Sequence, residues 1–193
     1  MRSFAFTAVL SLALAACGGD TDAGGDVSTQ GNLADDAAVN DVLGAGEKRA
    51  GATVLPTDAA GFANAVAASD LYEIESSALA REKASSAELR SFAQRLEREH
   101  RASSDQLKQA AAGLTVSPAL DPEQQAMIDE LKAASGAEFD GKYLGQQRLA
   151  HQKTLMLLQN YAGAGDNDSL KAFAEKARPM VEQHADMLNY MRR

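Results

Sequence analysis

Three histidines are the residues of this sequence best suited to chemistry. His100, His151 and His184 are the only histidines in the chain, and each falls on the inner face of a different predicted helix. Imidazole, together with carboxylate, binds iron, zinc, copper or manganese, so the cluster could hold one transition-metal ion. The candidate ligands are two acids and the three imidazoles: Glu73, Glu99, His100, His151 and His184. Three further polar residues are expected to support them: Asp140, Tyr143 and Gln147.

Two other interpretations of the histidines stay open. They could be structural, each paired with a Glu or Tyr from another helix, because an unpaired buried imidazole would cost about 1–3 kcal/mol. A di-iron carboxylate site would need two Glu-x-x-His steps, and Glu97-x-x-His100 is one. The second is missing, since Arg148 and Val181 stand three residues before the other two histidines. A full di-iron site is therefore not expected.

Helical spacing and capping signals predict the elements that must position these residues. A first helix should follow Thr57 and run to about residue 84, with Glu73 facing inward. Ser85 and Glu88 have capping-box spacing at the start of a second helix that ends near Gly113. The later predicted helices span residues 121–134, 137–162 and 169–191, the second opened by a capping box at Ser135 and Glu138 and the last one bent by Pro179.

The short helix has a geometric role in the predicted fold. A loop over residues 114–120 can span about 25 Å, and a helix over 121–134 about 20 Å. Together they can cross a bundle of about 40 Å from end to end. The expected fold is all-α, a ferritin-like four-helix bundle over residues 57–193 with a short crossover helix between the second and third long helices.

The sequence of the N-terminus is typical of a targeting segment. Arg2 precedes an apolar run from Phe4 to Leu14, and Leu14-Ala15-Ala16-Cys17 resembles the lipobox of bacterial lipoproteins. Residues 1–16 would then be a signal peptide and Cys17 the lipidated residue; an ordinary secretory signal is the alternative. Residues 17–56 are acidic, Gly-rich and poor in large apolar side chains, which predicts a disordered tether. Gly18 after the cysteine favours the outer membrane, facing the periplasm.

Composition limits the function. A net charge of −8 without a basic stripe argues against a nucleic-acid partner. No nucleophile triad or phosphate loop is evident, so catalysis is not the first expectation. The first hypothesis is a lipid-anchored envelope protein acting as a binding or stress-associated module. The alternatives are a metal-binding or redox protein that uses the His/Glu cluster, and a pH-responsive module, since histidines titrate near pH 6.5.

Ordered motifs give the chain a resemblance to a known family. They are Phe92-Ala93-Gln94-Arg95-Leu96, Glu99-His100, Gly136-Ala137-Glu138-Phe139-Asp140 with Tyr143, Gln147 and His151, and Pro179 with His184. Over residues 61–190 the sequence resembles the bacterial domain-of-unknown-function 4142 family. The resemblance implies a secreted or lipid-anchored ferritin-like bundle, and recurrent positions at Glu73, Glu99-His100, His151 and His184, but no settled activity. Arg178 and Glu97 depart from the family pattern, which makes the Glu-x-x-His step look incidental.

Overall fold

A computed structural model describes residues 54–191, and these residues form five helices and no strand. The helices are α1 (Ala59–Lys83), α2 (Ala87–Ala110), α3 (Pro122–Ala133), α4 (Gly136–Ala164) and α5 (Asp168–Tyr190). The predicted all-α class is confirmed. None of these helices is both long enough and apolar enough to cross a membrane. The predicted signal peptide, the lipidated Cys17 and the tether up to residue 53 lie outside the described residues.

The helix caps follow local hydrogen bonding and differ in places from the predicted ones. Asp58, rather than Thr57, caps α1, and its carboxylate accepts from the Gly61 amide at 2.7 Å. Ser86 caps α2, because the side chain of Ser85 is bound instead to Asp140. The expected cap at Asp121 is confirmed as a full capping box with Gln124.

The predicted capping box at the start of α4 does not form. Ser135 occupies the N-cap position, but its side chain makes no capping hydrogen bond. The next residue, Gly136, has a φ of +55°, a conformation that glycine adopts at little cost. The corner between α3 and α4 is therefore turned by the backbone of Gly136 rather than closed by a side chain.

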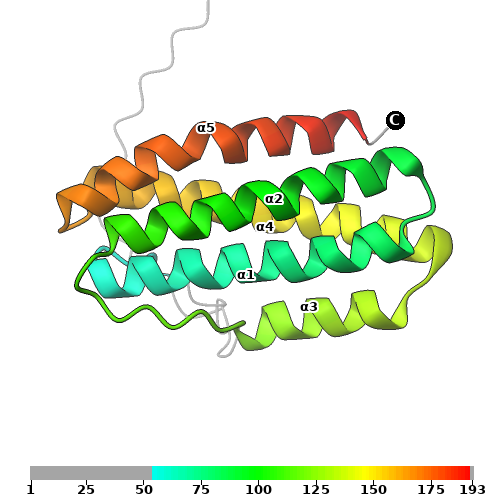
Figure 1. Cartoon of the computed structure of the whole chain (residues 1–193), viewed down its shortest axis with the longest axis horizontal. Coiled ribbons are helices and arrows are strands. Elements are labelled where there is room, and N and C mark those ends of the chain that lie inside the picture. Colours follow the sequence, from blue (N-terminus) through cyan, green and yellow to red (C-terminus); the bar gives the residue numbers. More distant parts are fainter. Residues whose placement is uncertain (1–53, 192–193) are drawn as a thin grey trace, which may run out of the picture. The chain divides into compact units, whose positions relative to one another are not determined.

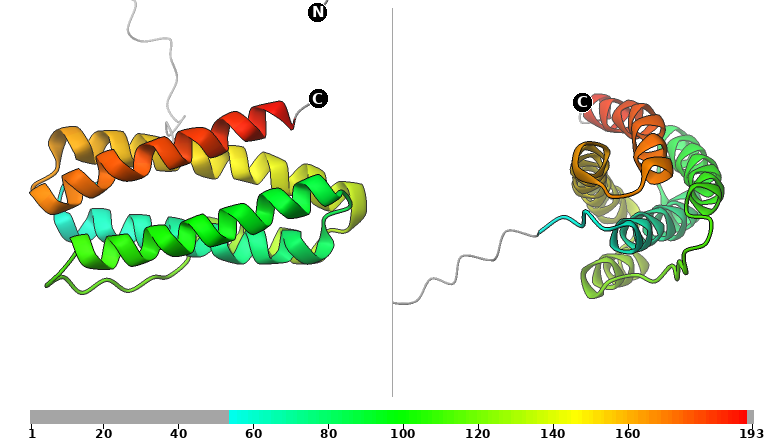
Figure 2. Two further views of the ribbon diagram at one scale, coloured as in Figure 1. Left: turned by 45° about the horizontal axis from the view of Figure 1, so that its top comes forward. Right: turned by 90° about the vertical axis from the view of Figure 1, so that its left-hand side faces the viewer.

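The four long helices pack as two antiparallel pairs, α1 with α2 and α4 with α5 (Figure 1). The pairs meet through α1 against α4 and α2 against α5, and the end-on view in Figure 2 shows α3 outside this group. The loop that follows α2, together with α3, returns the chain to the other end of the bundle. Helices α2 and α4 therefore run in the same direction. The short helix α3 packs on α1 and α4.

The core consists of two apolar clusters with a polar layer between them. One cluster lies near the α4–α5 turn and includes Phe62, Leu107, Leu158, Tyr161 and Phe173. The other lies near the α1–α2 turn and includes Phe92, Leu96, Phe139, Tyr143 and Leu188. On each long helix the intervening inward positions are polar, and the buried acids and imidazoles among them are Asp70, Glu73, His100, His151 and His184. The two apolar ends thus hold this polar layer in place from both sides.

The turn after α4 gives a direct test of the packing of the first cluster. A Cβ at Gly165 would lie 2.5–2.7 Å from ring atoms of Tyr161, a buried ring stacked on Phe62 at 3.8 Å between centroids. We expect Gly165→Ala to lower the free energy of unfolding by about 1–3 kcal/mol through this overlap. Urea denaturation would measure it.

Gly163→Ala is the matched control for that substitution. A Cβ at Gly163, two residues earlier and inside α4, would meet no atom within 4 Å. Since alanine favours helix over glycine, this variant should be unchanged or more stable by up to about 1 kcal/mol. Equal stability losses in the two variants would contradict the packing described for the turn.

Candidate metal centre

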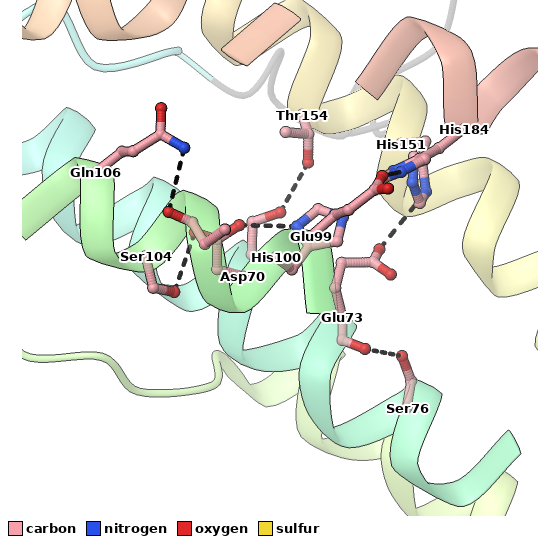
Figure 3. Close-up of polar contacts among 12 residues, drawn as sticks. Asp70, Glu73, Ser76, Glu99, His100, Ser104, Gln106, His151, Thr154 and His184 are labelled. Carbon is pink, nitrogen blue, oxygen red and sulfur yellow. Dashed lines mark hydrogen bonds and ion pairs between the residues drawn. The ribbon is translucent and has the colours of Figure 1, made fainter. Parts of the chain in front are cut away.

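The three imidazoles meet in the polar layer at the middle of the bundle. Their ring centroids lie 5.8 Å apart for His100 and His151, 5.5 Å for His100 and His184, and 5.4 Å for His151 and His184. One nitrogen of each ring lies within 4.8 Å of one nitrogen of each other ring. All three residues are at most 2% exposed. Figure 3 shows their side chains converging from α2, α4 and α5.

Asp70 on α1 holds the ring of His100. The His100 Nδ1–H donates to Asp70 Oδ1 at 2.8 Å, and both side chains are almost fully buried. The second carboxylate oxygen of Asp70 accepts from the Ser104 hydroxyl at 3.2 Å. A carboxylate that accepts from one ring nitrogen fixes the ring orientation and leaves the other nitrogen available.

The other two imidazoles are held in the same way by different acceptors. His151 Nδ1–H donates to the backbone carbonyl of Gln147 at 2.8 Å. His184 Nε2–H donates to Glu99 Oε2 at 2.6 Å. Each of the three rings therefore has one nitrogen committed as a donor to an oxygen acceptor.

The remaining nitrogen of each ring has no hydrogen-bond partner within residues 54–191. These atoms are His100 Nε2, His151 Nε2 and His184 Nδ1, and all are buried. In a neutral imidazole whose other nitrogen donates, such an atom carries a free lone pair. Buried polar atoms are normally satisfied, so three unsatisfied lone pairs in one cluster point to a bound group.

Glu73 on α1 adds a carboxylate to the same cluster. The residue is 1% exposed, and neither carboxylate oxygen has a hydrogen-bond partner in the described part of the chain. Its Oε1 lies 3.6 Å from His151 Nδ1. Burial raises the pKa of Glu73 to about 7, against the opposing influence of His100.

The three histidines do not titrate alike. Burial lowers the pKa of His184 to about 4, helped by the nearby His100, while the bond to Glu99 opposes it. Burial and the other two imidazoles lower the pKa of His151 well below its usual value. Burial also opposes protonation of His100, but Asp70, Glu73 and Glu99 outweigh it and raise its pKa. A positive charge in the cluster is therefore most stable on His100.

Some of the predicted site residues lie in the cluster and others do not. The three histidines are brought together, and Glu73 lies beside them with its Oε1 3.6 Å from His151 Nδ1. Glu99 contacts the cluster from outside, through His184. Asp140 binds the Ser85 amide at 3.0 Å at the end of the bundle. Tyr143 bonds Ser77 at 3.1 Å, and Gln147 donates to Ser76 at 3.0 Å while its backbone carbonyl holds His151.

Asp70 contacts the cluster but is not among the residues predicted from the sequence. It stands three residues before Glu73 and four after Val66, so it shares the inner face of α1 with both. That spacing was visible in the sequence. Ser69 and Asp70 are both buried, and helical spacing alone does not show which of these neighbours pairs with His100.

Glu97 does not take part in the cluster. Its carboxylate pairs with Arg81 at 2.7 Å and with Arg101 at 2.8 Å, and both arginines are largely exposed. The Glu-x-x-His step formed with His100 therefore does not point its acid at the histidines.

The pKa of His184 predicts how the metal-free domain responds to acid. Between about pH 6.5 and 4 the unfolded chain protonates residue 184 and the folded chain does not, so stability falls as the pH falls. His184→Gln removes this group. We expect chelator-treated wild type to lose about 2 kcal/mol more than the variant between pH 7 and pH 5 in urea denaturation. Equal losses of stability in wild type and His184→Gln would contradict the lowered pKa of His184. They would also weaken the hypothesis of a pH-responsive module.

Comparison with known proteins identifies the family of this chain. Residues 45–191 match the family described as Domain of unknown function (DUF4142), which is well over half of the sequence. No curated protein and no solved structure matches the chain. The predicted resemblance is thereby confirmed at the level of the family, and the chain belongs to the DUF4142 family.

Proposed function

We propose that this domain binds one divalent transition-metal ion through His100, His151 and His184, with Glu73 as the fourth ligand. The observation that carries the proposal is the convergence of three buried imidazoles, each with one nitrogen held by an oxygen acceptor and the other without a partner among the described residues. Metal-bound histidines in proteins usually have this arrangement, because the outer acceptor fixes ring and tautomer.

The charge of the cluster also supports a cation. Asp70 and Glu73 are both buried, and the ion pairs of these two acids in the described chain are with His100 and His151 rather than with Lys or Arg. Protonating more than one of three imidazoles less than 6 Å apart is unfavourable. A divalent ion would offset the buried negative charge and occupy the three free lone pairs together.

The donor set favours particular metals. Three imidazole nitrogens and one carboxylate oxygen suit zinc, copper, cobalt, nickel or ferrous iron better than calcium or magnesium, which prefer oxygen ligands. Tetrahedral bonds of about 2.05 Å would place the ligand nitrogens about 3.4 Å apart. The nitrogens lie within 4.8 Å of one another, so small side-chain movements would suffice.

The connectivity supports a ferritin-like bundle as the scaffold of this site. Two antiparallel helix pairs joined by one long crossover, with ligands projecting inward from all four long helices, are features of that fold. The proposed site differs from a di-iron centre, because Glu97 is paired with surface arginines. It would hold a single ion.

The sequence supports placing this domain at the bacterial cell envelope. The lipobox-like stretch ending at Cys17 and the acidic segment after it would attach the domain to the outer membrane and let it face the periplasm. There it would act as a binding or stress-associated module by taking up metal ions from the periplasm. This part of the proposal rests on sequence alone.

Metal content tests the central proposal. Protein purified without chelator should contain close to one transition-metal ion per chain by elemental analysis, and His100→Ala should contain less than a tenth of that. Adding Zn²⁺ at about one hundred times its Kd to the metal-free protein should stabilise it by about 2.7 kcal/mol. For a domain of this size this is roughly 8 °C in melting temperature.

Tyr143→Phe is the control for loss of metal through general destabilisation. It removes a buried hydroxyl that bonds Ser77, outside the proposed ligand set. The variant should be less stable by about 1 kcal/mol yet keep its metal. Metal that is substoichiometric in wild type and unchanged in His100→Ala would rule the site out.

Cell fractionation tests the proposed anchor. Wild type should fractionate with the outer membrane, and Cys17→Ser should be released into the soluble periplasm because it has no residue to lipidate. Gly18→Asp should stay membrane-bound but move to the inner membrane. A Cys17→Ser protein that still sediments with membranes would show that Cys17 is not the anchor.

A further inference from the structure

The proposed metal site faces solvent through Glu99. Asp70, Glu73 and the three histidines are at most 3% exposed, whereas the side chain of Glu99 is 26% exposed. One oxygen of Glu99 accepts from His184 Nε2 at 2.6 Å, and the other accepts from Arg95 Nε at 2.9 Å. This carboxylate therefore connects a buried imidazole with a partly exposed guanidinium.

Arg95 is held over Glu99 by three acceptors from two helices. Besides Glu99 on α2, its guanidinium donates to Gln183 Oε1 at 2.6 Å and to Met187 Sδ at 3.3 Å, both on α5. Two oxygens and a thioether sulfur thus surround one positive charge. We name these four residues, Arg95, Glu99, Gln183 and Met187, the Arg95 clamp.

The acceptors of the Arg95 clamp are groups that can also bind a metal ion. Carboxylate and amide oxygens and a thioether are all metal ligands in proteins, and the guanidinium of Arg95 donates to all three. The clamp joins α2 to α5 beside His184, and Glu99 within it is partly exposed to solvent. An ion that approached the cluster from this side would meet these acceptors before His184.

We propose that the Arg95 clamp is the uptake site for the divalent metal ion and that Arg95 keeps it closed. An incoming ion displaces the guanidinium, binds Glu99 and Gln183, and passes to His184 and the other imidazoles; Arg95 then closes behind it. This inference rests on the proposed metal-binding function and adds its route. A clamp of this kind slows uptake and release together and leaves the final affinity nearly unchanged.

Arg98 provides a matched control within the same turn of α2. It carries the same charge and lies 3.8 Å from the same Glu99 oxygen, but it is 66% exposed and outside hydrogen-bonding distance. Removing Arg98 therefore changes the local charge as removing Arg95 does, without opening the clamp. Comparing the metal exchange rates of the two variants therefore distinguishes closure of the site by Arg95 from general repulsion of a cation by a nearby positive charge.

Stopped-flow mixing of metal-free protein with Co²⁺, followed by visible absorption, tests the proposal. Arg95→Gln should speed both uptake and release about tenfold, since it removes a charge-assisted set of hydrogen bonds, with a Kd within about threefold of wild type. Arg98→Gln should match wild-type rates within about twofold. Glu99→Gln should slow uptake and weaken binding about 10–100-fold. Circular dichroism confirms that each variant is folded.

Arg95→Lys separates the shape of the clamp from its charge. Lysine keeps the positive charge but lacks the planar fork that reaches three acceptors at once, so this variant should also exchange Co²⁺ faster than wild type. If Arg95→Gln takes up and releases Co²⁺ at the same rates as Arg98→Gln, the proposed role of the Arg95 clamp is wrong, while the proposed metal site still stands. Wild-type protein that binds no Co²⁺ at equilibrium would instead overturn the proposed function, and the clamp with it.

Discussion

The burial of acids and imidazoles at the centre of the bundle is the constraint on which the rest of this structure depends. Asp70 and Glu73 are removed from water along with three histidines, and a buried charge is costly unless it is paired and hydrogen-bonded. The two apolar clusters on either side supply the packing that keeps this layer dry. Asp70, Glu99 and the Gln147 carbonyl each bond one nitrogen of a ring, and the other nitrogens have no hydrogen-bond partner among the described residues.

Much of the fold could be predicted from the sequence, because amphipathic spacing and the breaks between helices are local signals. Asp121-Pro122 correctly marked the start of α3. The caps of α1 and α2 were each misplaced by one residue, since Thr57 and Asp58, or Ser85 and Ser86, are equally suited to capping. Only the tertiary bond from Asp140 shows why Ser85 is engaged elsewhere.

The sequence predicts which face of each helix carries the polar residues of the site. His100, His151, His184 and Glu73 could be assigned to inner faces, but periodicity does not give the partner of each ring nitrogen. That choice depends on distances between helices, which is why the bonds from His100 to Asp70 and from His184 to Glu99 do not follow from the sequence. Asp140 shares the inward side of α4 with Tyr143 and Gln147, yet three turns of helix separate it from His151.

X-ray absorption at the edge of the metal that co-purifies with the protein tests the central claim most directly. The account predicts a four-coordinate ion with three imidazole ligands at about 2.0–2.1 Å and one oxygen ligand at a similar distance. An ion coordinated by oxygen alone, or by fewer than two imidazoles, would contradict it.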